Sequence, residues 1–266
     1  MNNEKLKQEV HAYWNKASCG TEYTHNKKFS KEYFEDIEQF RYKVEPEIFS
    51  FAQFTRFHGK KLLEVGIGAG TDFLQWVRAG TQAHGIDLTQ EAIDNVKQRL
   101  ALYDLSAEEI RVADAEALPY ADNYFDVVYS HGVIHHSPNT IKCLEEIIRV
   151  AKPGGCVKIM IYNRHSLFAF YRYLLCGLFR GKPFRSFSNV LFNDQESLGT
   201  KAYTFKEVKS ILASYPITIM QLKATVTSHD LLYYKSKPIQ FLAYCAAVLF
   251  GWNNVGWFMT LELQKK

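Results

Sequence analysis

The feature that most constrains the fold is a glycine-rich turn between a predicted strand and a predicted helix. The strand covers residues 61–65, the turn reads GIGAG over residues 66–70, and the helix carries apolar side chains over residues 73–77. Glycines at alternating positions let the backbone turn sharply and approach a ligand where side chains would collide. The start of the helix presents free N–H groups and a positive dipole end, which favours an anionic group. The turn therefore predicts a ligand site at the carboxyl end of the strand.

The sequence around this turn predicts an α/β fold. Short apolar runs alternate with amphipathic stretches between residues 60 and 163, a pattern typical of βαβ units in a parallel sheet. A further helix at 203–214 and two strands at 217–225 and 257–263 complete the sheet, so we expect seven mostly parallel strands with helices on both faces. The five earlier strands are expected at 61–65, 83–87, 110–114, 125–131 and 156–162. Two further helices are expected at 90–103 and 139–150, and Thr89 is the expected N-cap of the first.

The length of 266 residues fits one main domain with additions. We expect an N-terminal helical cap over residues 1–58 and the main domain over residues 59–266. A stretch at about 164–202 lacks clear alternation, and we interpret it as a lid inserted after the fifth strand. Aromatic residues make up 15% of the chain and crowd its first 60 residues and the part after residue 160. This distribution places a hydrophobic pocket or lid in those parts.

Acidic residues end the second and third predicted strands. Asp87 lies 23 residues after Glu64, about where an acid that binds a ribose is expected, and its two oxygens can accept both sugar hydroxyls. Asp114 ends the third strand, before Ala115, and its carboxylate can accept a hydrogen bond from an adenine amine. The fourth strand brings His131 to the same edge. These strand ends predict a site for an adenosine-containing ligand.

Four segments carry a resemblance to a known family. LLEVGIGAGTD, GIDLTQEAI, DAEALPYADNYFDVVYSHGVIHH and RVAKPGG follow one another over residues 61–163. They resemble the successive motifs of class I S-adenosylmethionine-dependent methyltransferases. The resemblance implies a Rossmann-like fold, S-adenosyl-L-methionine as the cofactor, and methyl transfer by in-line displacement as the reaction.

The resemblance also implies roles for individual residues. The glycine turn would hold the methionine end of the cofactor, the acid after the second strand its ribose, and the acid after the third strand its adenine. Glu64 matches the acid that orders the turn in this family. The implied cofactor-binding residues are Glu64, Gly66, Gly68, Gly70, Thr71, Asp87, Leu88, Asp114, Ala115 and His131.

Methyl transfer from a sulfonium requires mainly that the acceptor be positioned and water excluded. A base helps if the acceptor is an alcohol, a phenol or an acidic carbon, and His131, His135 and His136 follow the fourth strand where acceptors lie. The alternative is that these histidines pack or cap the turn. No metal site is expected, since the histidine pair has no carboxylate at ligand spacing. The five cysteines are far apart, which indicates reduced thiols and a cytoplasmic protein.

Candidate acceptor contacts come from two parts of the chain. Tyr13, Trp14 and Tyr23 belong to the aromatic N-terminal segment, which we expect to fold over the pocket, because aromatic faces attract a sulfonium and exclude water. The alternative is that these rings pack helices on the domain. Asn163 and Arg164 end the fifth strand at the same edge, which makes them candidate substrate contacts as well.

Rival functions fit the residues less well. A nicotinamide dinucleotide site would need a third glycine where Thr71 stands, and Glu64 would lie near a pyrophosphate. A kinase-type phosphate loop is excluded, because no Gly-Lys-Ser/Thr follows the turn. Two features argue against a nucleic-acid partner. The net charge is +4 without a long basic run, and no Asn/Asp-Pro-Pro-aromatic motif follows the fourth strand.

Three hypotheses remain for the function. We favour a small-molecule acceptor enclosed by the N-terminal segment and the lid. The second is a lipid-like or quinone acceptor at a membrane surface, with the apolar segments 167–179 and 239–252 as the membrane contacts. Each segment is shorter than the ~20 residues of a spanning helix, and neither has the Lys/Arg-rich polar face typical of an interfacial helix. The third is a protein that binds S-adenosylmethionine without catalysis. The sequence leaves the oligomeric state open.

Overall fold

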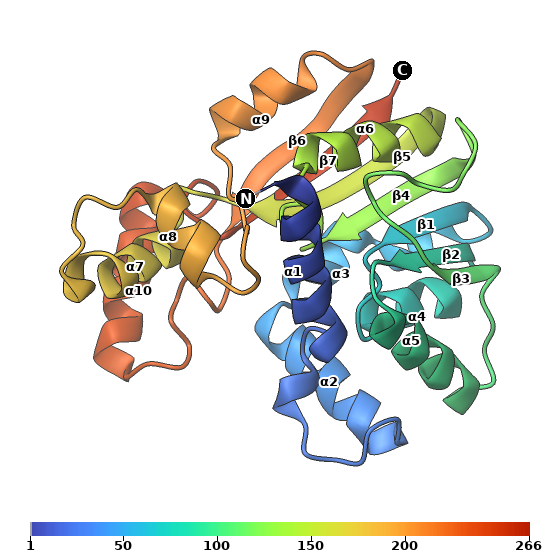
Figure 1. Cartoon of the computed structure of the whole chain (residues 1–266), viewed down its shortest axis with the longest axis horizontal. Helices are drawn as coiled ribbons and strands as arrows, with labels where there is room; N and C mark the ends of the chain where they lie inside the picture. Colours follow the sequence, from blue (N-terminus) through green and yellow to red (C-terminus); the bar gives the residue numbers. More distant parts are fainter. Residues whose placement is uncertain (1) are drawn as a thin grey trace.

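The computed structural model describes residues 2–266, and a seven-stranded sheet forms its centre (Figure 1). The strand order is β3-β2-β1-β4-β5-β7-β6, and every neighbouring pair is parallel except those that β7 makes with β5 and β6. The seven-stranded, mostly parallel sheet is thereby confirmed. The strands are β1 (Lys61–Val65), β2 (Gln82–Asp87), β3 (Glu109–Val112), β4 (Phe125–His131), β5 (Ala151–Tyr162), β6 (Ile217–Thr225) and β7 (Phe258–Lys265).

The chain changes direction across the sheet between β1 and β4. From β1 it runs outward through β2 to β3, and from β4 it runs the other way to β5. Ligands of open α/β sheets bind at such a switch point, outside the carboxyl ends of the strands. The glycine turn after β1 and the end of β4 lie on the two sides of this point.

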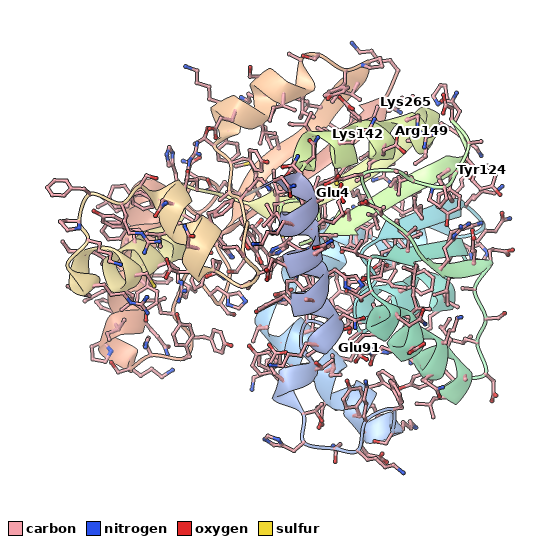
Figure 2. All side chains as sticks on the ribbon, in the orientation of Figure 1. Glu4, Glu91, Tyr124, Lys142, Arg149 and Lys265 are labelled. Atoms are coloured by element: carbon pink, nitrogen blue, oxygen red, sulfur yellow. The ribbon has the colours of Figure 1, made fainter. Side chains whose placement is uncertain are left out.

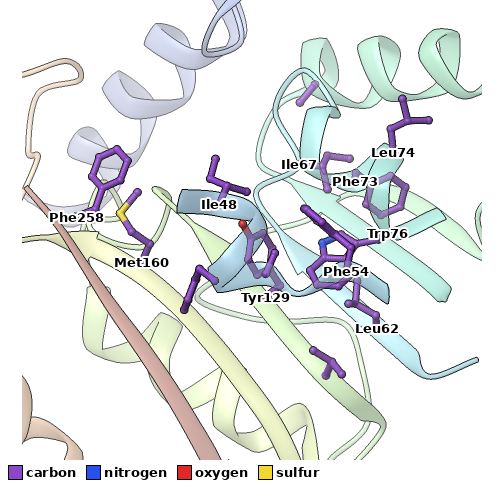
Figure 3. Packing of buried hydrophobic residues seen from close by; sticks show 14 of the residues in the cluster. Ile48, Phe54, Leu62, Ile67, Phe73, Leu74, Trp76, Tyr129, Met160 and Phe258 are labelled. Atoms are coloured by element: carbon purple, nitrogen blue, oxygen red, sulfur yellow. The ribbon is translucent and has the colours of Figure 1, made fainter. Parts of the chain in front are cut away.

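Helices cover both faces of the sheet, as the sequence predicts. On one face lie α4 (Thr71–Arg78) and α5 (Gln90–Leu102), and on the other lie α6 (Thr140–Val150) and α9 (Phe205–Leu212) (Figure 1). Trp76 of α4 is fully buried, and its ring packs edge-on against Phe54 and Tyr129 (Figure 3). Its burial fixes α4, and with it the glycine turn, against the sheet.

Several elements begin or end away from their predicted bounds. β3 ends at Val112 rather than at residue 114, so Asp114 lies in the loop beyond the sheet. β5 starts five residues early, because Phe125 already pairs with Ala151 before the register shifts to the pair Val127–Cys156. The Pro-Gly-Gly turn is therefore a bulge within the strand. α9 is shorter than expected, since a capping box at Thr204 starts it at residue 205.

The N-terminal segment forms helices that pack on the glycine-turn side of the sheet. These are α1 (Asn3–Lys16), the 3-10 turn η1 (Thr21–Tyr23), α2 (Lys31–Val44), α3 (Glu47–Ala52) and the 3-10 turn η2 (Phe54–Phe57). α2 packs against α4 and α5, and α1 packs against α5. Phe34 and Ile37 of α2 are buried together with Ala69 of the turn. The N-terminal helices are thus attached directly to the predicted ligand site.

The segment after β5 is helical and joins a helix from farther along the chain. It contains α7 (Leu167–Cys176), the 3-10 turn η3 (Leu178–Arg180) and α8 (Phe187–Asp194). α7 packs against α8 and also against α10 (Lys237–Phe250), which connects β6 to β7. We call α7, η3, α8 and α10 the helical lobe; it lies at the left in Figure 1. No helix among residues 2–266 is both long enough and apolar enough to cross a bilayer.

Candidate active site

A deep pocket opens at the carboxyl edge of the sheet, beneath α1. It has a volume of about 1360 Å³, including its open mouth. All ten residues expected to bind the cofactor line it or belong to the turn that forms its floor.

The glycine turn provides the floor of the pocket. Gly66, Gly68 and Gly70 have φ angles of 83°, 49° and 76°, in the left-handed region that favours glycine. A Cβ on Gly66 would come within 2.3 Å of Val133, whereas a Cβ on Gly68 would meet no atom within 4 Å. The turn therefore packs against the protein at Gly66 and faces open space at Gly68. A side chain at Gly68 would fill the cradle that a ligand needs.

Asp87, at the end of β2, orders this turn. Its Oδ2 accepts a hydrogen bond from the Gly68 N–H at 3.1 Å, and its Oδ1 accepts from the backbone and the hydroxyl of Thr89 at 3.0 and 2.9 Å. Burial raises the pKa of the Asp87 carboxyl despite these bonds. Asp87 and Leu88 both line the pocket. Asp87 thus reaches the ligand space and shapes the turn beneath it.

Asp114 and Ala115 line the pocket at the far side of β2, where α1 covers them. Lys7 of α1 places its Nζ 2.7 Å from Asp114 Oδ2 and 2.8 Å from Glu116 Oε2. Asp114 Oδ1 accepts a hydrogen bond from the Glu116 N–H. The acid that the family resemblance assigns to adenine therefore already has two partners. Lys7 ties α1 down over this end of the pocket.

Glu64 and Thr71 stand on the two sides of the turn. Glu64 is buried, and burial together with the nearby Asp72 carboxylate raises the pKa of its carboxyl group well above its usual value. Its Oε2 has no hydrogen-bond partner within residues 2–266. A buried carboxyl that lacks a partner and lines a pocket fits the amino group of an amino-acid ligand. Thr71 Oγ1 accepts a hydrogen bond from Arg99 at 3.0 Å.

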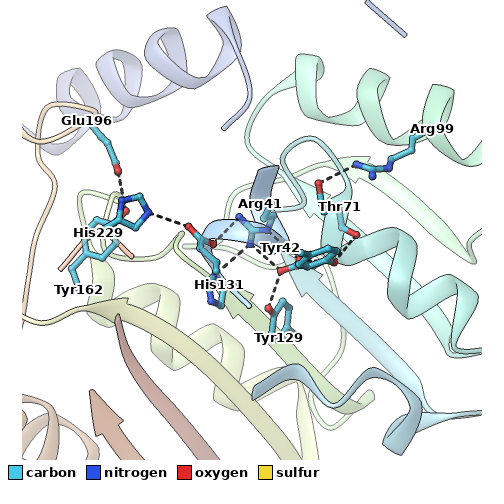
Figure 4. A network of polar contacts seen from close by, with 11 residues as sticks. Arg41, Tyr42, Thr71, Arg99, Tyr129, His131, Tyr162, Glu196 and His229 are labelled. Carbon is cyan, nitrogen blue, oxygen red and sulfur yellow. Dashed lines mark hydrogen bonds and ion pairs between the residues drawn. The ribbon is translucent and has the colours of Figure 1, made fainter. Parts of the chain in front are cut away.

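A buried ion pair joins the N-terminal helices to the pocket (Figure 4). Arg41 of α2 donates to Asp72 of α4 through Nε at 3.2 Å and through Nη2 at 3.0 Å. The hydroxyls of Tyr129 and Tyr42 donate to the same carboxylate at 2.9 and 3.2 Å. Burial opposes ionisation of Asp72, but the Arg41 guanidinium lowers its pKa below the usual value. This network fixes the side of the pocket next to β4.

His131, at the end of β4, is neutral in this environment. Its Nδ1 lies 3.4 Å from Arg41 Nη2, and because arginine only donates, Nδ1 is the acceptor and Nε2 carries the proton. Burial and the positive charge of Arg41 lower the pKa of His131 to about 4. His131 is therefore a hydrogen-bond donor toward the pocket and a poor proton acceptor at neutral pH.

His135 and His136 occupy different environments. His135 is fully buried outside the pocket lining, its ring packs against Tyr162, and burial lowers its pKa well below the usual value. His136 lines the pocket, with Nδ1 3.0 Å from the hydroxyls of Ser197 and Thr200. Nε2 of His136 faces the Glu196 carboxylate, which only accepts hydrogen bonds, so Nε2 carries the proton and Nδ1 accepts from the Ser197 hydroxyl. The ring lone pair of His136 therefore lies on Nδ1, beside the Ser197 hydroxyl.

Glu196, which follows α8, brings the inserted segment into the pocket (Figure 4). Its Oε2 lies 3.2 Å from His136 Nε2, and the Tyr162 hydroxyl donates to both of its oxygens at 3.0 and 3.1 Å. Burial opposes ionisation, but the bonds from His136 and Tyr162 lower the pKa of Glu196 below its usual value. Its φ of 52° is left-handed, which costs about 1–3 kcal/mol for a residue other than glycine. Surrounding contacts therefore hold this carboxylate in place.

Comparison with known proteins identifies the domain around the pocket. Residues 63–159 match the family model described as a methyltransferase domain. Residues 63–159 therefore form a methyltransferase domain. The matched residues include the glycine turn, Asp87, Asp114 and the three histidines after β4.

Curated relatives share this methyltransferase domain and little else. Phosphoethanolamine N-methyltransferase 2 of Caenorhabditis elegans is 34% identical over 107 residues, which is 40% of this chain and 24% of that protein. Arsenite methyltransferase of Halobacterium salinarum is 35% identical over 104 residues, 38% of this chain and 27% of that protein. Malonyl-[acyl-carrier protein] O-methyltransferase of Erwinia billingiae is 33% identical over 121 residues, 46% of this chain and 45% of that protein. The chain thus spans less than half the length of these relatives.

Solved methyltransferase structures share the fold over nearly the whole chain. Geranyl diphosphate C-methyltransferase from Streptomyces coelicolor superposes with a TM-score of 0.64 at 14% identity, covering 98% of both chains. Magnesium protoporphyrin IX methyltransferase from Synechocystis superposes with a TM-score of 0.61 at 12% identity, covering 98% of this chain and 100% of that one. The helices added to the sheet therefore belong to the architecture of this fold.

The three aromatic candidates of the N-terminal segment, Tyr13, Trp14 and Tyr23, lie in different places relative to the pocket. Trp14 lines the pocket, and its ring packs edge-on against His136 with centroids 5.2 Å apart. Tyr13 and Tyr23 lie outside the lining, with 46% and 49% of their surface exposed. Tyr13 packs against Trp14, and Tyr23 stacks on Phe40 at 3.6 Å. Of the three, only Trp14 is placed to touch a ligand.

The two candidate substrate contacts at the end of β5, Asn163 and Arg164, bind other parts of the protein instead. Asn163 is fully buried, and its Nδ2 donates to the carbonyls of Asn254 and Gly256 at 2.9 Å each. Arg164 forms an ion pair with Glu207 of α9. Neither residue lines the pocket. Both connect the end of β5 to neighbouring segments.

Sequence reasoning missed four polar residues that shape this methyltransferase pocket. They share one property: each comes from a helix or insert remote from the family motifs. The only signal in the sequence was the aromatic-rich N-terminal segment, which indicates a cover but no charged partner. The four residues are Lys7, Arg41, Glu45 and Glu196.

Proposed function

We propose that the protein transfers the methyl group of S-adenosylmethionine to a nucleophile on a small molecule held in this pocket. One observation carries the proposal: a single pocket joins the glycine turn and the strand-end acids to a second region lined by Trp14, His136, Tyr162 and Glu196. The first region fits the cofactor and the second fits an acceptor. When bound, S-adenosylmethionine supplies an electrophilic methyl group on a sulfonium.

The cofactor half would hold S-adenosylmethionine along the strand ends. Asp87 would accept the ribose hydroxyls, and the open face of Gly68 would accommodate the methionine end. The unpartnered Glu64 carboxyl lies where a ligand amino group would provide its counter-charge. Asp114 and Ala115 would border the adenine, with Lys7 holding α1 above them.

The acceptor half supplies positioning and a proton acceptor. Aromatic walls that exclude water and hold a nucleophile in line can lower the barrier by roughly 7–11 kcal/mol. His131 would orient the acceptor through its Nε2–H. A proton lost by an acceptor hydroxyl would pass to the Glu196 carboxylate, which the His136 Nε2–H and the Tyr162 hydroxyl hold in place. His135 has no part in this scheme, because it lies outside the pocket.

Two other functions remain distinct hypotheses. The exposed apolar side chains of α10 favour a lipid-like or quinone acceptor at a membrane surface as the second candidate. A protein that binds S-adenosylmethionine without catalysis would use the same cofactor half. It would not need the His136–Glu196 pair at the acceptor end.

The deciding experiment uses methyl-labelled S-adenosylmethionine and a fractionated extract of the source cell, with the labelled product identified by mass spectrometry. We expect label in a small polar or aromatic metabolite, and Glu196→Gln should reduce its formation while calorimetric binding of the cofactor persists. Label in the lipid fraction would support the second candidate. Cofactor binding without turnover on any fraction would support the third. Folded protein that produced no heat with S-adenosylmethionine would contradict all three.

A further inference from the structure

Helix α10 has its small side chains toward the protein and its large apolar side chains toward solvent. Ala247 is its one buried residue, while Phe241, Leu242 and Leu249 are 65%, 67% and 77% exposed. A surface helix in water shows the opposite arrangement, with apolar residues inward and polar residues outward. Small residues at the packed face and large apolar residues at the outer face suit a helix whose outer side meets lipid.

The rest of the lobe extends this apolar surface. Phe170 of α7 and Phe179 of η3 are 50% and 73% exposed, and Phe184 in the following loop is fully exposed. α7 packs against α10, so two separate parts of the chain contribute to the same lobe. The side chains of this lobe stand out from its ribbon on the side away from the sheet (Figure 2). Several large apolar side chains exposed on one lobe indicate an interaction site.

The charges of the lobe have one predominant sign. Residues 164–194 and 231–261 together contain seven basic side chains and one acidic side chain, Asp194. Asp194 pairs with Arg180 and Arg185, and Arg164 pairs with Glu207 of α9. Lys235 lies over the ring of Tyr234 at 5.1 Å, and Lys237 contacts Gln240 at 3.4 Å, contacts that leave both positive charges uncompensated. Lys182 is exposed in the loop beside Phe184. The apolar surface is therefore accompanied by positive charge.

We propose that the helical lobe docks on a bilayer that contains anionic lipids, with α10 lying in the plane of the interface. Its exposed phenylalanine and leucine side chains enter the acyl boundary, and the lysines contact the headgroups. Tyr244 and Trp252, 50% and 39% exposed, are the residue types enriched at that depth. The helix has 14 residues, about 21 Å at 1.5 Å per residue against a core of about 30 Å, so it lies on the membrane. This surface goes beyond methyl transfer and is independent of the acceptor.

Charge favours a membrane over a second copy of the chain. In a two-fold symmetric interface each copy presents the same patch, so the lysines at the edge of one lobe would face those of the other. Like charges placed opposite one another weaken such an interface. An anionic surface complements them.

The first test is flotation of the full chain with vesicles of phosphatidylcholine alone or mixed with phosphatidylglycerol. We expect binding to the mixed vesicles that weakens as salt is added. The double variant Lys235→Gln, Lys237→Gln should bind these vesicles roughly 30-fold more weakly, from the contribution of two lysines near an anionic surface. Lys97→Gln with Lys206→Gln, on α5 and α9, is the matched control and should bind normally.

The second test removes the apolar contacts. Phe241→Ser with Leu249→Ser should abolish flotation, whereas Val112→Ser with Met220→Ser, at exposed positions of the sheet, should not. Trp252 fluorescence should shift to the blue with the mixed vesicles, and Trp252→Phe should remove the shift. Calorimetry with S-adenosylmethionine verifies that each variant is folded.

The proposal is overturned if the full chain binds neither kind of vesicle, or if the lobe variants and the control variants bind alike. A lobe variant that converts a dimer to a monomer without any vesicle binding would also overturn it.

Discussion

Arg41 supplies the positive charge around which the acidic side of the pocket is arranged. It bonds Asp72 and lies 3.4 Å from Glu45, which in turn lies 3.6 Å from His229. Burial raises the pKa of Glu45, but Arg41, His229 and His131 together outweigh burial, and the net pKa is lowered. The same guanidinium disfavours a proton on His131. Arg41 therefore favours the ionised form of two carboxylates and the neutral form of one imidazole.

Replacement of Arg41 by methionine should destabilise the protein strongly. Methionine keeps the length of the side chain but leaves the Asp72 carboxylate buried without a cation, a loss of about 3 kcal/mol in the free energy of unfolding. Urea denaturation monitored by circular dichroism measures it. Arg78→Met is the control, since the ion pair of Arg78 with Glu38 is long, at 3.4 Å, and partly exposed, and should contribute less than about 1 kcal/mol. Equal losses in the two variants would refute the role assigned to Arg41.

His131 should make stability depend on pH. The unfolded chain binds a proton at this residue near pH 6.5, and the folded protein only near pH 4. Between these values the unfolded state binds more protons, so the free energy of unfolding falls as the pH decreases, by roughly 3 kcal/mol when complete. His131→Gln should flatten this slope, whereas His165→Gln, at an exposed position, should not. Denaturation midpoints measured from pH 7 to pH 4 test this, and parallel slopes for wild type and His131→Gln would contradict it.

At the scale of elements, the sequence predicted best where periodicity and turn residues agree. β1, β4 and β6 have the predicted bounds. The end of β3 was misplaced, since the sequence does not show that Asp114 leaves the sheet to meet Lys7. The lobe helices had no clear periodicity, because apolar residues lie on their outer faces as well. Helix prediction from the sequence relies on apolar residues recurring on one face, and this pattern is lost when the exposed face is apolar as well.

Helix α1 should loosen when its tie to the sheet edge is removed. Lys7→Met eliminates both ion pairs with Asp114 and Glu116 while retaining the apolar stem of the side chain. A partly buried pair of this kind contributes roughly 1 kcal/mol, so the amides of α1 should exchange about five-fold faster. Hydrogen exchange read by mass spectrometry resolves α1 from the strands. Lys5→Met, exposed on the same helix, is the control; a similar acceleration in that variant would show that α1 is held by other contacts.

At the scale of the whole molecule, three distant parts of the chain meet at one pocket. The strand ends of the sheet form its floor, α1 and α2 form one wall, and the insert after α8 contributes Glu196. The sequence could predict the floor, because strand order and turn chemistry follow local rules. It could not predict the walls, because nothing local states which side chain of a remote helix pairs with which strand end. The acceptor region belongs to these walls.

Because the proposed cofactor site is lined by both the floor and the helix that covers it, binding of the cofactor should stabilise the molecule as one unit. At a concentration 100 times the dissociation constant, a ligand that binds only the folded state adds about 2.7 kcal/mol to its stability. For a chain of this size that corresponds to a rise in Tm of roughly 5 °C. S-adenosylmethionine should produce this rise in a thermal scan of the wild-type protein, with a single transition.

Asp87→Ala should remove the rise, since the substitution deletes the ribose acceptor and releases the Gly68 N–H that shapes the turn. The variant's own Tm without ligand serves as its reference, because loss of these hydrogen bonds lowers stability by itself. Asp94→Ala, on the exposed side of α5, is the control and should keep the full rise. If Asp87→Ala retained the wild-type shift, the cofactor would not be held at the end of β2. If the wild-type scan split into two transitions, of which only one moved, the helices above the pocket would not fold as a unit with the sheet.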